Sequence, residues 1–342
     1  MDIFSTNILT GVVNSLQNVP PQFLVDTFFP GLQTEAREEI YFDVESDIMM
    51  LAPFVSPYRE GQILTNLGYT TKSFKPAYVK PKNVWDPQAA LKRMPGEALM
   101  GSMNPADRMR ALVAQSLLAH RNMINRRLEW MAAQILATGK VTISGDAYET
   151  VVIDFLRDAS LTIPLTGASR WGQTGVVPLN DLQTWTDMIQ QMSGSAARTV
   201  VMSLGAWKLF KQDASVTARL YNRLPVAGAP TLLQDAQIGV GGNYRGSIDA
   251  FDIWTYSGYY RDAGGTTQPL MPVNTLLMLG QMQGVKAFGA IQDHESLEAV
   301  PYFSKSWLEE DPSRRMVMTQ SAPLLVPYRP NASLCATVTA AA

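Results

Sequence analysis

Cysteine and histidine are nearly absent from this chain. Its 342 residues include one cysteine, Cys335, and two histidines, His120 and His294. A single cysteine excludes an internal disulfide and is typical of a reducing compartment, and these counts exclude a zinc site built from cysteine and histidine. His120 lies on or beside the apolar stripe of a long predicted helix, which favours a packed or interface residue. His294 stands between Asp293 and Glu295, a spacing that metal sites do not use. We therefore expect no metal and no cofactor.

Long apolar runs and a strong net charge are also missing. No segment offers the roughly 18 consecutive apolar residues of a membrane-spanning helix, so we expect no membrane contact. The N-terminal stretch has Asp2 where a signal peptide carries lysine or arginine, which predicts that the protein remains in the cytosol of the cell that makes it. The chain has 28 Lys and Arg residues against 30 Asp and Glu, a net charge of -2. Any electrostatic function is therefore local.

Recognisable catalytic motifs are missing as well. No serine lies in a G-x-S-x-G elbow. The stretch GVGGNYRG, residues 239–246, lacks both the G-x-G-x-x-G order and the Lys-Ser/Thr pair of a phosphate-binding loop, so a flexible glycine-rich loop is the better interpretation. We predict that the protein is not an enzyme and has no catalytic residue. A pair of carboxylates brought together by the fold would escape this search, so a cytosolic enzyme with an unrecognised carboxylate site stays open as an alternative.

The composition that remains is that of a folded protein. Hydrophobic residues make up 46% of the chain, enough to bury a core in two or more subdomains. The clearest element is a helix over residues 105–138, where Asn104 is a good N-cap and Pro105 occupies the first position. Asp107 favours the positive end of the helix dipole, and Gly139 is placed to end the helix. A helix of this length spans about 50 Å, which suits a spine across a flat, elongated molecule.

The rest of the chain mixes strands and helices without a regular strand-helix-strand repeat. Residues 141–155 alternate like a hairpin with its turn at Gly145 and Asp146, and Asn180 is expected to cap a helix that runs through Met192. Further expected elements are strands at 199–203, 251–260 and 275–280 and a helix at 206–212. This content predicts the α+β class and argues against a doubly wound nucleotide-binding fold.

A proline-punctuated stretch before the long helix has no apolar face wide enough to build a core. Within it, residues 54–65 and 69–82 have the character of two strands joined at residues 66–68. Each arm would reach roughly 40 Å, and an isolated ribbon of two strands is only marginally stable in water. We therefore predict that the ribbon packs on another subunit. The alternative is a flap over the sheet of its own subunit.

Charge is segregated along the chain. Six acids between residues 35 and 47, opposed by Arg37 alone, form an acidic segment: Glu35, Glu38, Glu39, Asp43, Glu45 and Asp47. Five arginines lie on the polar face of the predicted long helix: Arg108, Arg110, Arg121, Arg126 and Arg127. This face is either solvated and partly paired with the acidic segment, or a basic surface that binds the phosphates of a polyanion without reading sequence.

Particular runs of residues resemble a known family. FKPAYVKPK (74–82) followed by DPQAALKRMP (86–95) is similar to the major capsid proteins of lambda-like tailed phages. The runs FVSP (54–57), GKVTISGDAY (139–148) and TQSAPLLV (319–326) occur in the same order as in that family. The resemblance covers nearly the whole chain. YVKPK with the following DPQ and L-K-R-x-P is its most specific part, and the middle third matches loosely.

The resemblance implies a Hong Kong 97-type capsid fold, which is an α+β fold. Its parts would be an N-terminal arm (1–48), an extended β-hairpin loop (49–97), a peripheral domain with the spine helix and a β-hairpin (98–177), an axial domain (178–292) and return strands of the peripheral domain (293–342). The extended loop would contact a neighbouring subunit through Phe74, Lys75, Pro76, Tyr78, Val79, Lys80, Pro81 and Lys82. The acidic segment and the arginines of the spine helix would form complementary strips between subunits.

The implied function is that of a major capsid protein. It would assemble with itself as hexamers and pentamers in the host cytoplasm and enclose double-stranded DNA in the icosahedral head of a virion. A separate scaffolding protein is implied, because the short arm leaves no room for an assembly domain, together with a portal protein and a small decoration protein on the outer surface. An encapsulin-like nanocompartment shell and a tail-tube subunit, which would form open helical stacks, stay open as alternatives.

Overall fold

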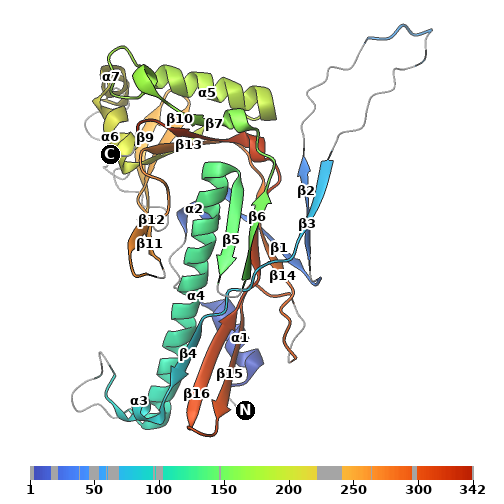
Figure 1. Cartoon of the computed structure of the whole chain (residues 1–342), viewed down its shortest axis with the longest axis vertical. Coiled ribbons are helices and arrows are strands. Elements are labelled where there is room, and N and C mark those ends of the chain that lie inside the picture. Colours follow the sequence, from blue (N-terminus) through green and yellow to red (C-terminus); the bar gives the residue numbers. More distant parts are fainter. Residues whose placement is uncertain are drawn as a thin grey trace, which may run out of the picture.

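The structure, a computed structural model of the chain, describes residues 4–16, 22–37, 39–45, 54–58, 60, 69–94, 97, 103–145, 148–221, 241–262, 264–294 and 299–340. The molecule is elongated (Figure 1). A broad sheet covered by helices lies at one end, a narrow sheet lies at the other, and one long helix runs between them. A single long helix therefore connects the two sheets at the ends of the molecule.

The long helix, α4 (Pro105–Thr138), has the predicted bounds. Asn104 is the N-cap, and its side-chain oxygen accepts a hydrogen bond of 2.8 Å from the backbone N–H of Asp107. Gly139 follows the last turn with a φ of 71°, a left-handed conformation that glycine adopts without strain. Arg157 completes this end because its guanidinium donates to two carbonyl oxygens of the last turn, at 2.7 and 2.8 Å.

The broad sheet has six strands in the order β7-β18-β13-β8-β10-β9. They are β7 (Thr162–Pro164), β8 (Thr199–Ser203), β9 (Gly242–Ile248), β10 (Phe251–Tyr256), β13 (Thr275–Leu279) and β18 (Ser333–Thr337). Side chains alternate between its faces, so that Val200 joins one buried cluster and Val201 another. The sheet is therefore buried on both sides.

Three helices cover one face of this sheet: α5 (Pro178–Ser193), α6 (Leu204–Gln212) and α7 (Ala214–Tyr221). The core beneath them includes Trp171 and Trp185, whose rings stack with their centroids 6.1 Å apart. Two 3-10 turns, η1 (Ala159–Leu161) and η2 (Gly167–Ser169), precede these helices. The expected N-cap at Asn180 is wrong, because α5 already begins at Pro178, whose fixed φ suits the first helical position.

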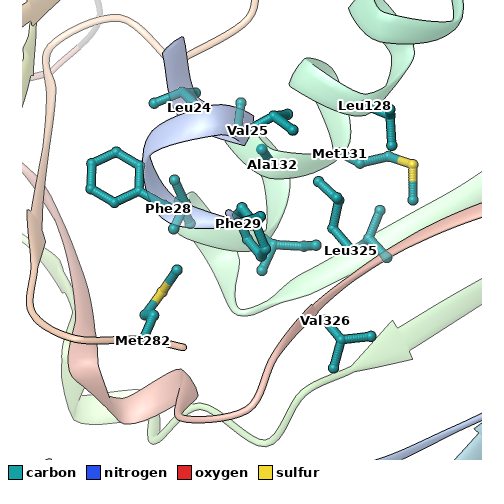
Figure 2. Close-up of a cluster of buried hydrophobic side chains, with 14 of the residues drawn as sticks. Leu24, Val25, Phe28, Phe29, Leu128, Met131, Ala132, Met282, Leu325 and Val326 are labelled. Atoms are coloured by element: carbon teal, nitrogen blue, oxygen red, sulfur yellow. The ribbon is translucent and has the colours of Figure 1, made fainter. Parts of the chain in front are cut away.

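The opposite face of the six-stranded sheet packs on α4 and on the short helix α2 (Phe23–Phe28). Figure 2 shows Phe28 and Phe29 beside Ala132 of α4 and Leu325. The same cluster includes a three-stranded sheet in the order β1-β14-β17. Its strands are β1 (Gly31–Glu35), β14 (Gly284–Gly289) and β17 (Pro323–Pro327), and the turn η3 (Pro330–Ala332) follows them.

The narrow sheet at the other end has the order β15-β16-β4. Its strands are β15 (Phe303–Glu309), β16 (Arg314–Gln320) and β4 (Lys82–Trp85), with the short helix α3 (Pro87–Leu91) after β4. Helix α1 (Thr6–Ser15) lies along the edge strand β15. The hydroxyl of Thr10 donates to the carbonyl oxygen of Ser304 at 3.1 Å and accepts from its N–H at 3.0 Å. A side chain of α1 therefore satisfies backbone groups of an edge strand.

Three two-stranded ladders complete the described elements: β2 (Ile40–Glu45) with β3 (Tyr69–Phe74), β5 (Lys140–Gly145) with β6 (Tyr148–Asp154), and β11 (Tyr259–Arg261) with β12 (Thr267–Pro269). The β5–β6 ladder confirms the hairpin predicted at 141–155. The elements β8, α6 and β13 also lie where they were expected, whereas the strand predicted at 251–260 is divided into β10 and β11. None of the helices within the described ranges is long and apolar enough to cross a membrane.

Candidate functional site

The extended ribbon is the first candidate surface for assembly, and its strand pairing differs from the predicted one. β3 pairs with β2 in an antiparallel register that places Ile40 opposite Phe74. The described partner of β3 is thus β2 and not the predicted stretch 54–65. The described residues of that stretch, 54–58 and 60, lie outside any strand, and its remaining residues lie outside those described. The acidic segment supplies the partner strand because Ile40 and Phe42 are buried and anchor β2.

β2 and β3 stand at one edge of the molecule (Figure 1). Their base is held by aromatic packing, since the rings of Phe42 and Phe155 lie 5.5 Å apart. Away from this base, Phe54 and Tyr58 are 108% and 96% exposed. Large exposed apolar side chains on an edge of this kind are typical of a surface that contacts another chain.

The YVKPK run lies against its own subunit. Val79 and Ser321 exchange two backbone hydrogen bonds, of 2.8 and 3.1 Å. The hydroxyl of Tyr78 donates to the carbonyl oxygen of Ala290 at 2.8 Å and accepts from the N–H of Gln292 at 3.3 Å. For this pair of residues the structure therefore favours the alternative of a flap over the same subunit.

The other predicted contact residues of the extended loop fall into two groups. Phe74 packs against the large buried cluster, Pro76 is buried, and the carbonyl oxygen of Pro81 accepts from a backbone N–H of β16 at 3.1 Å. The three lysines, Lys75, Lys80 and Lys82, are exposed. Contact between these lysines and a neighbouring subunit stays a prediction.

Two of the five predicted arginines of α4 are used inside the subunit. Arg108 forms an ion pair with Glu97, with 2.7 Å between Nη2 and Oε1, and its hydrogen bonds lower the pKa of the Glu97 carboxyl. Arg121 donates to the carbonyl oxygens of Val13 and Leu16, at 2.5 and 2.8 Å. These arginines tie α4 to other segments of its own chain.

The remaining three arginines are exposed. Arg110 pairs with an acid of its own helical turn at 2.9 Å. The guanidinium of Arg127 lies over the ring of Trp130, 5.0 Å from its centroid. Arg126, Arg127 and Arg261 of β11 line a hollow of about 530 Å³ between α4 and the β11–β12 ladder. We call this the cationic hollow.

The acidic segment lies on β1 and β2. Four of its six acids are described: Glu35 on β1, Glu39 just before β2, and Asp43 and Glu45 on β2. The other two, Glu38 and Asp47, lie outside the described residues. Among the acids of this segment whose side chains are described, Glu35 and Glu39, neither forms an ion pair with a described arginine of α4. Pairing of the acidic segment with the arginines of α4, within one subunit or between subunits, stays a prediction.

Glu129 of α4 is a buried carboxylate that joins three parts of the chain, and sequence reasoning missed it. Its oxygens accept hydrogen bonds from the N–H groups of Leu24 and Val25, at 2.9 and 3.0 Å, and from the hydroxyl of Tyr256 at 2.9 Å. Burial raises the pKa of the Glu129 carboxyl to about 7, and burial also raises the pKa of the Tyr256 hydroxyl. In the sequence, the small residues Ala132 and Ala133, one helical turn after Glu129, were the signal that this face of the helix is buried.

His120 and Cys335 are both buried. His120 is buried, which confirms its interpretation as a packed residue, and its Nδ1 lies 3.1 Å from the hydroxyl of Thr319. Burial lowers the pKa of this histidine. Burial also raises the pKa of the Cys335 thiol to about 11. Over the described ranges, no group of three or more His, Cys, Asp and Glu side chains is arranged to hold a metal ion.

Comparison with known proteins gives one family for this chain. The family described as phage major capsid protein E matches residues 5–338. The chain is 29% identical to the major capsid protein of Escherichia phage lambda, over 95% of this chain and 96% of that protein. It is 28% identical to the major capsid protein of Enterobacteria phage phi80, over 97% of this chain and 98% of that protein.

Solved structures show the same fold at lower sequence identity. A prophage capsid protein from E. coli CFT073 superposes with a TM-score of 0.77 at 23% identity, over 98% of this chain and 99% of that chain. The capsid of cyanophage P-SCSP1u gives a TM-score of 0.52 at 8% identity, over 95% and 90% of the two chains. These similarities confirm the α+β capsid fold that was expected from the sequence.

Proposed function

The chain belongs to the family of phage major capsid protein E, and on this premise we propose that it forms hexamers and pentamers that close an icosahedral shell around double-stranded DNA. The observation that supports this most strongly is the family match over residues 5–338, which is nearly the whole chain. The elongated subunit with an exposed ribbon at one edge fits a role in which neighbours complete each other's surfaces (Figure 1). The proposed role is structural and includes no catalytic step.

We also propose how the described elements divide among the parts of the capsid subunit. The acidic strand β2, which was assigned to the N-terminal arm (1–48), pairs with β3 of the extended loop. The extended loop is therefore proposed to begin at Ile40. The helix α4 is the spine of the peripheral domain, and the six-stranded sheet with α5, α6 and α7 supplies the axial domain.

A scaffolding protein, a portal protein and a small decoration protein are proposed as further partners, on the strength of the family resemblance. Contact with packaged DNA is proposed to be weak, independent of sequence and sensitive to salt. Arg110 is the predicted arginine proposed for such contact, because it is exposed and lies outside the cationic hollow. Arg108 and Arg121 are tied to other segments of their own chain.

Electron microscopy of the chain, expressed alone and together with a scaffolding protein, tests the proposed function. Light scattering of the same samples gives the mass of the assemblies. Closed shells, or rings with five-fold and six-fold symmetry, are the expected result. A uniform dimer or tetramer under both conditions would contradict the proposal. Nuclease-protected DNA in shells from virions would support a phage head over an empty nanocompartment.

A further inference from the structure

The cationic hollow combines positive charge with an apolar floor. Three guanidinium groups, those of Arg126, Arg127 and Arg261, share a lining that contains no carboxylate. Met123 and Tyr259 lie in the same hollow and are 55% and 56% exposed. For the residues that the structure describes, none of the three guanidinium groups takes part in an ion pair. The three guanidinium groups are therefore able to bind an anionic group.

The acidic segment has the complementary property. The described acids Glu35 and Glu39 are partly exposed, and neither pairs with a basic side chain elsewhere in the described ranges. Arg37, the one base of the segment, lies over the ring of Tyr41, which is itself exposed. The described part of the segment therefore offers the carboxylates of Glu35 and Glu39 together with an exposed aromatic ring.

The two surfaces cannot meet within one subunit. The β11–β12 ladder lies along one side of α4, whereas β1, β2 and β3 lie on the other side (Figure 1). A contact between opposite edges of identical molecules is heterologous, and its repetition closes a ring when the rotation between neighbours divides a full turn evenly. Charge complementarity between the two edges thus fits the ring that a capsomer requires.

We infer that the cationic hollow binds Glu35 and Glu39 of the acidic segment of a second copy of this chain, an inference that rests on the proposed function. Arginine binds carboxylates with two parallel hydrogen bonds, and the partly apolar floor strengthens such bonds by excluding water. In this contact the exposed ring of Tyr41 packs against the apolar side chains of Met123 and Tyr259. A DNA backbone would satisfy the arginines and leave these apolar side chains without a partner, which favours the protein segment.

Charge exchange between the two surfaces tests the inference. R126E/R127E makes the hollow acidic, and E35K/E39K makes the segment basic. Each variant alone places like charges across every contact, so we expect at least about tenfold fewer rings and shells at equal concentration. A chain with all four substitutions restores opposite charges and is expected to assemble within about threefold of the unaltered chain.

A mixture of the two partial variants gives a sharper readout. Each variant then binds only the other, so the two chains must alternate around a ring. An alternating ring closes with six members and cannot close with five. Electron microscopy of the mixture is expected to show six-fold rings without five-fold rings.

The matched control is K208E/K211E, which reverses two exposed charges on α6 outside the hollow. It is expected to assemble within about threefold of the unaltered chain, because surface substitutions away from a contact have small effects. Thermal unfolding of every variant checks that the subunit still folds.

Two results would overturn the inference. In the first, the chain with four substitutions assembles no better than R126E/R127E. In the second, R126E/R127E forms normal shells and loses nuclease-protected DNA, which would assign the hollow to DNA. Failure of the unaltered chain to form rings or shells would instead contradict the proposed function and the inference with it.

Discussion

The buried carboxylate of Glu129 predicts a stability that falls as the pH rises towards neutrality. The pKa of this carboxyl rises from an ordinary value of 4.5 to about 7 in the folded chain, chiefly because of burial. Between these two pH values the unfolded chain loses the proton and the folded chain keeps it, so the free energy of unfolding decreases. At about 1.4 kcal/mol per pH unit, the total decrease from this group is about 3 kcal/mol and is complete above pH 7.

The substitution Glu129→Gln removes the titrating group and keeps the shape of the side chain. The free energy of unfolding of the wild type minus that of E129Q should therefore fall by about 3 kcal/mol between pH 4.5 and pH 8. Urea unfolding of the unassembled chain at several pH values, followed by tryptophan fluorescence, measures this difference. Other carboxyls, such as that of Glu97, have a lowered pKa, and the subtraction cancels their contribution.

Glu60→Gln is the matched control, because Glu60 is exposed. Because surface substitutions have small effects, its unfolding free energy should stay within about 0.5 kcal/mol of that of the wild type. If the difference between wild type and E129Q is constant from pH 4.5 to 8, Glu129 is not the buried, proton-retaining group that the structure indicates.

Three further changes have expected outcomes. Gly139→Ala should destabilise the subunit by about 1–2 kcal/mol in thermal unfolding, because the φ of 71° disfavours a side chain and the added Cβ would lie 2.7 Å from the Cβ of Arg157; an unchanged melting temperature would contradict this. Tyr78→Phe should cost about 1–2 kcal/mol of unfolding free energy in the unassembled chain, because two hydrogen bonds are lost, and a purely intersubunit role predicts no change there. F54A/Y58A should change the unfolding free energy of the unassembled chain by less than about 0.5 kcal/mol relative to the wild type. The same variant should reduce the yield of shells seen by electron microscopy. A normal yield would count against contact of these residues with a neighbouring subunit.

Elements with local signals were predictable from the sequence. The bounds of α4 follow from Asn104, Pro105 and Gly139, which act within one turn of the helix ends. The β5–β6 ladder likewise pairs residues that lie close together in the sequence. Residues close in sequence determine such elements, so their bounds do not depend on contacts with distant parts of the chain.

Pairings between distant segments were not predictable in the same way. β3 meets β2 across the stretch 46–68, and the choice of β2 depends on the burial of Ile40 against residues far along the chain. Glu129 is buried because α2 and Tyr256 approach it from two other regions. The helical pattern of α4 contains no information about the segments that approach Glu129.

The contact between Thr10 and Ser304 has a consequence for the order in which the chain is made. The two residues are 294 positions apart, and synthesis proceeds from the N-terminus at roughly 5–20 residues per second. Helix α1 therefore leaves the ribosome well before strand β15 exists. The exposed edge of β15, which would otherwise recruit strands from other nascent chains, meets its cover as soon as it emerges. The cover comes from the same polypeptide, so this protection does not depend on the concentration of subunits in the infected cell.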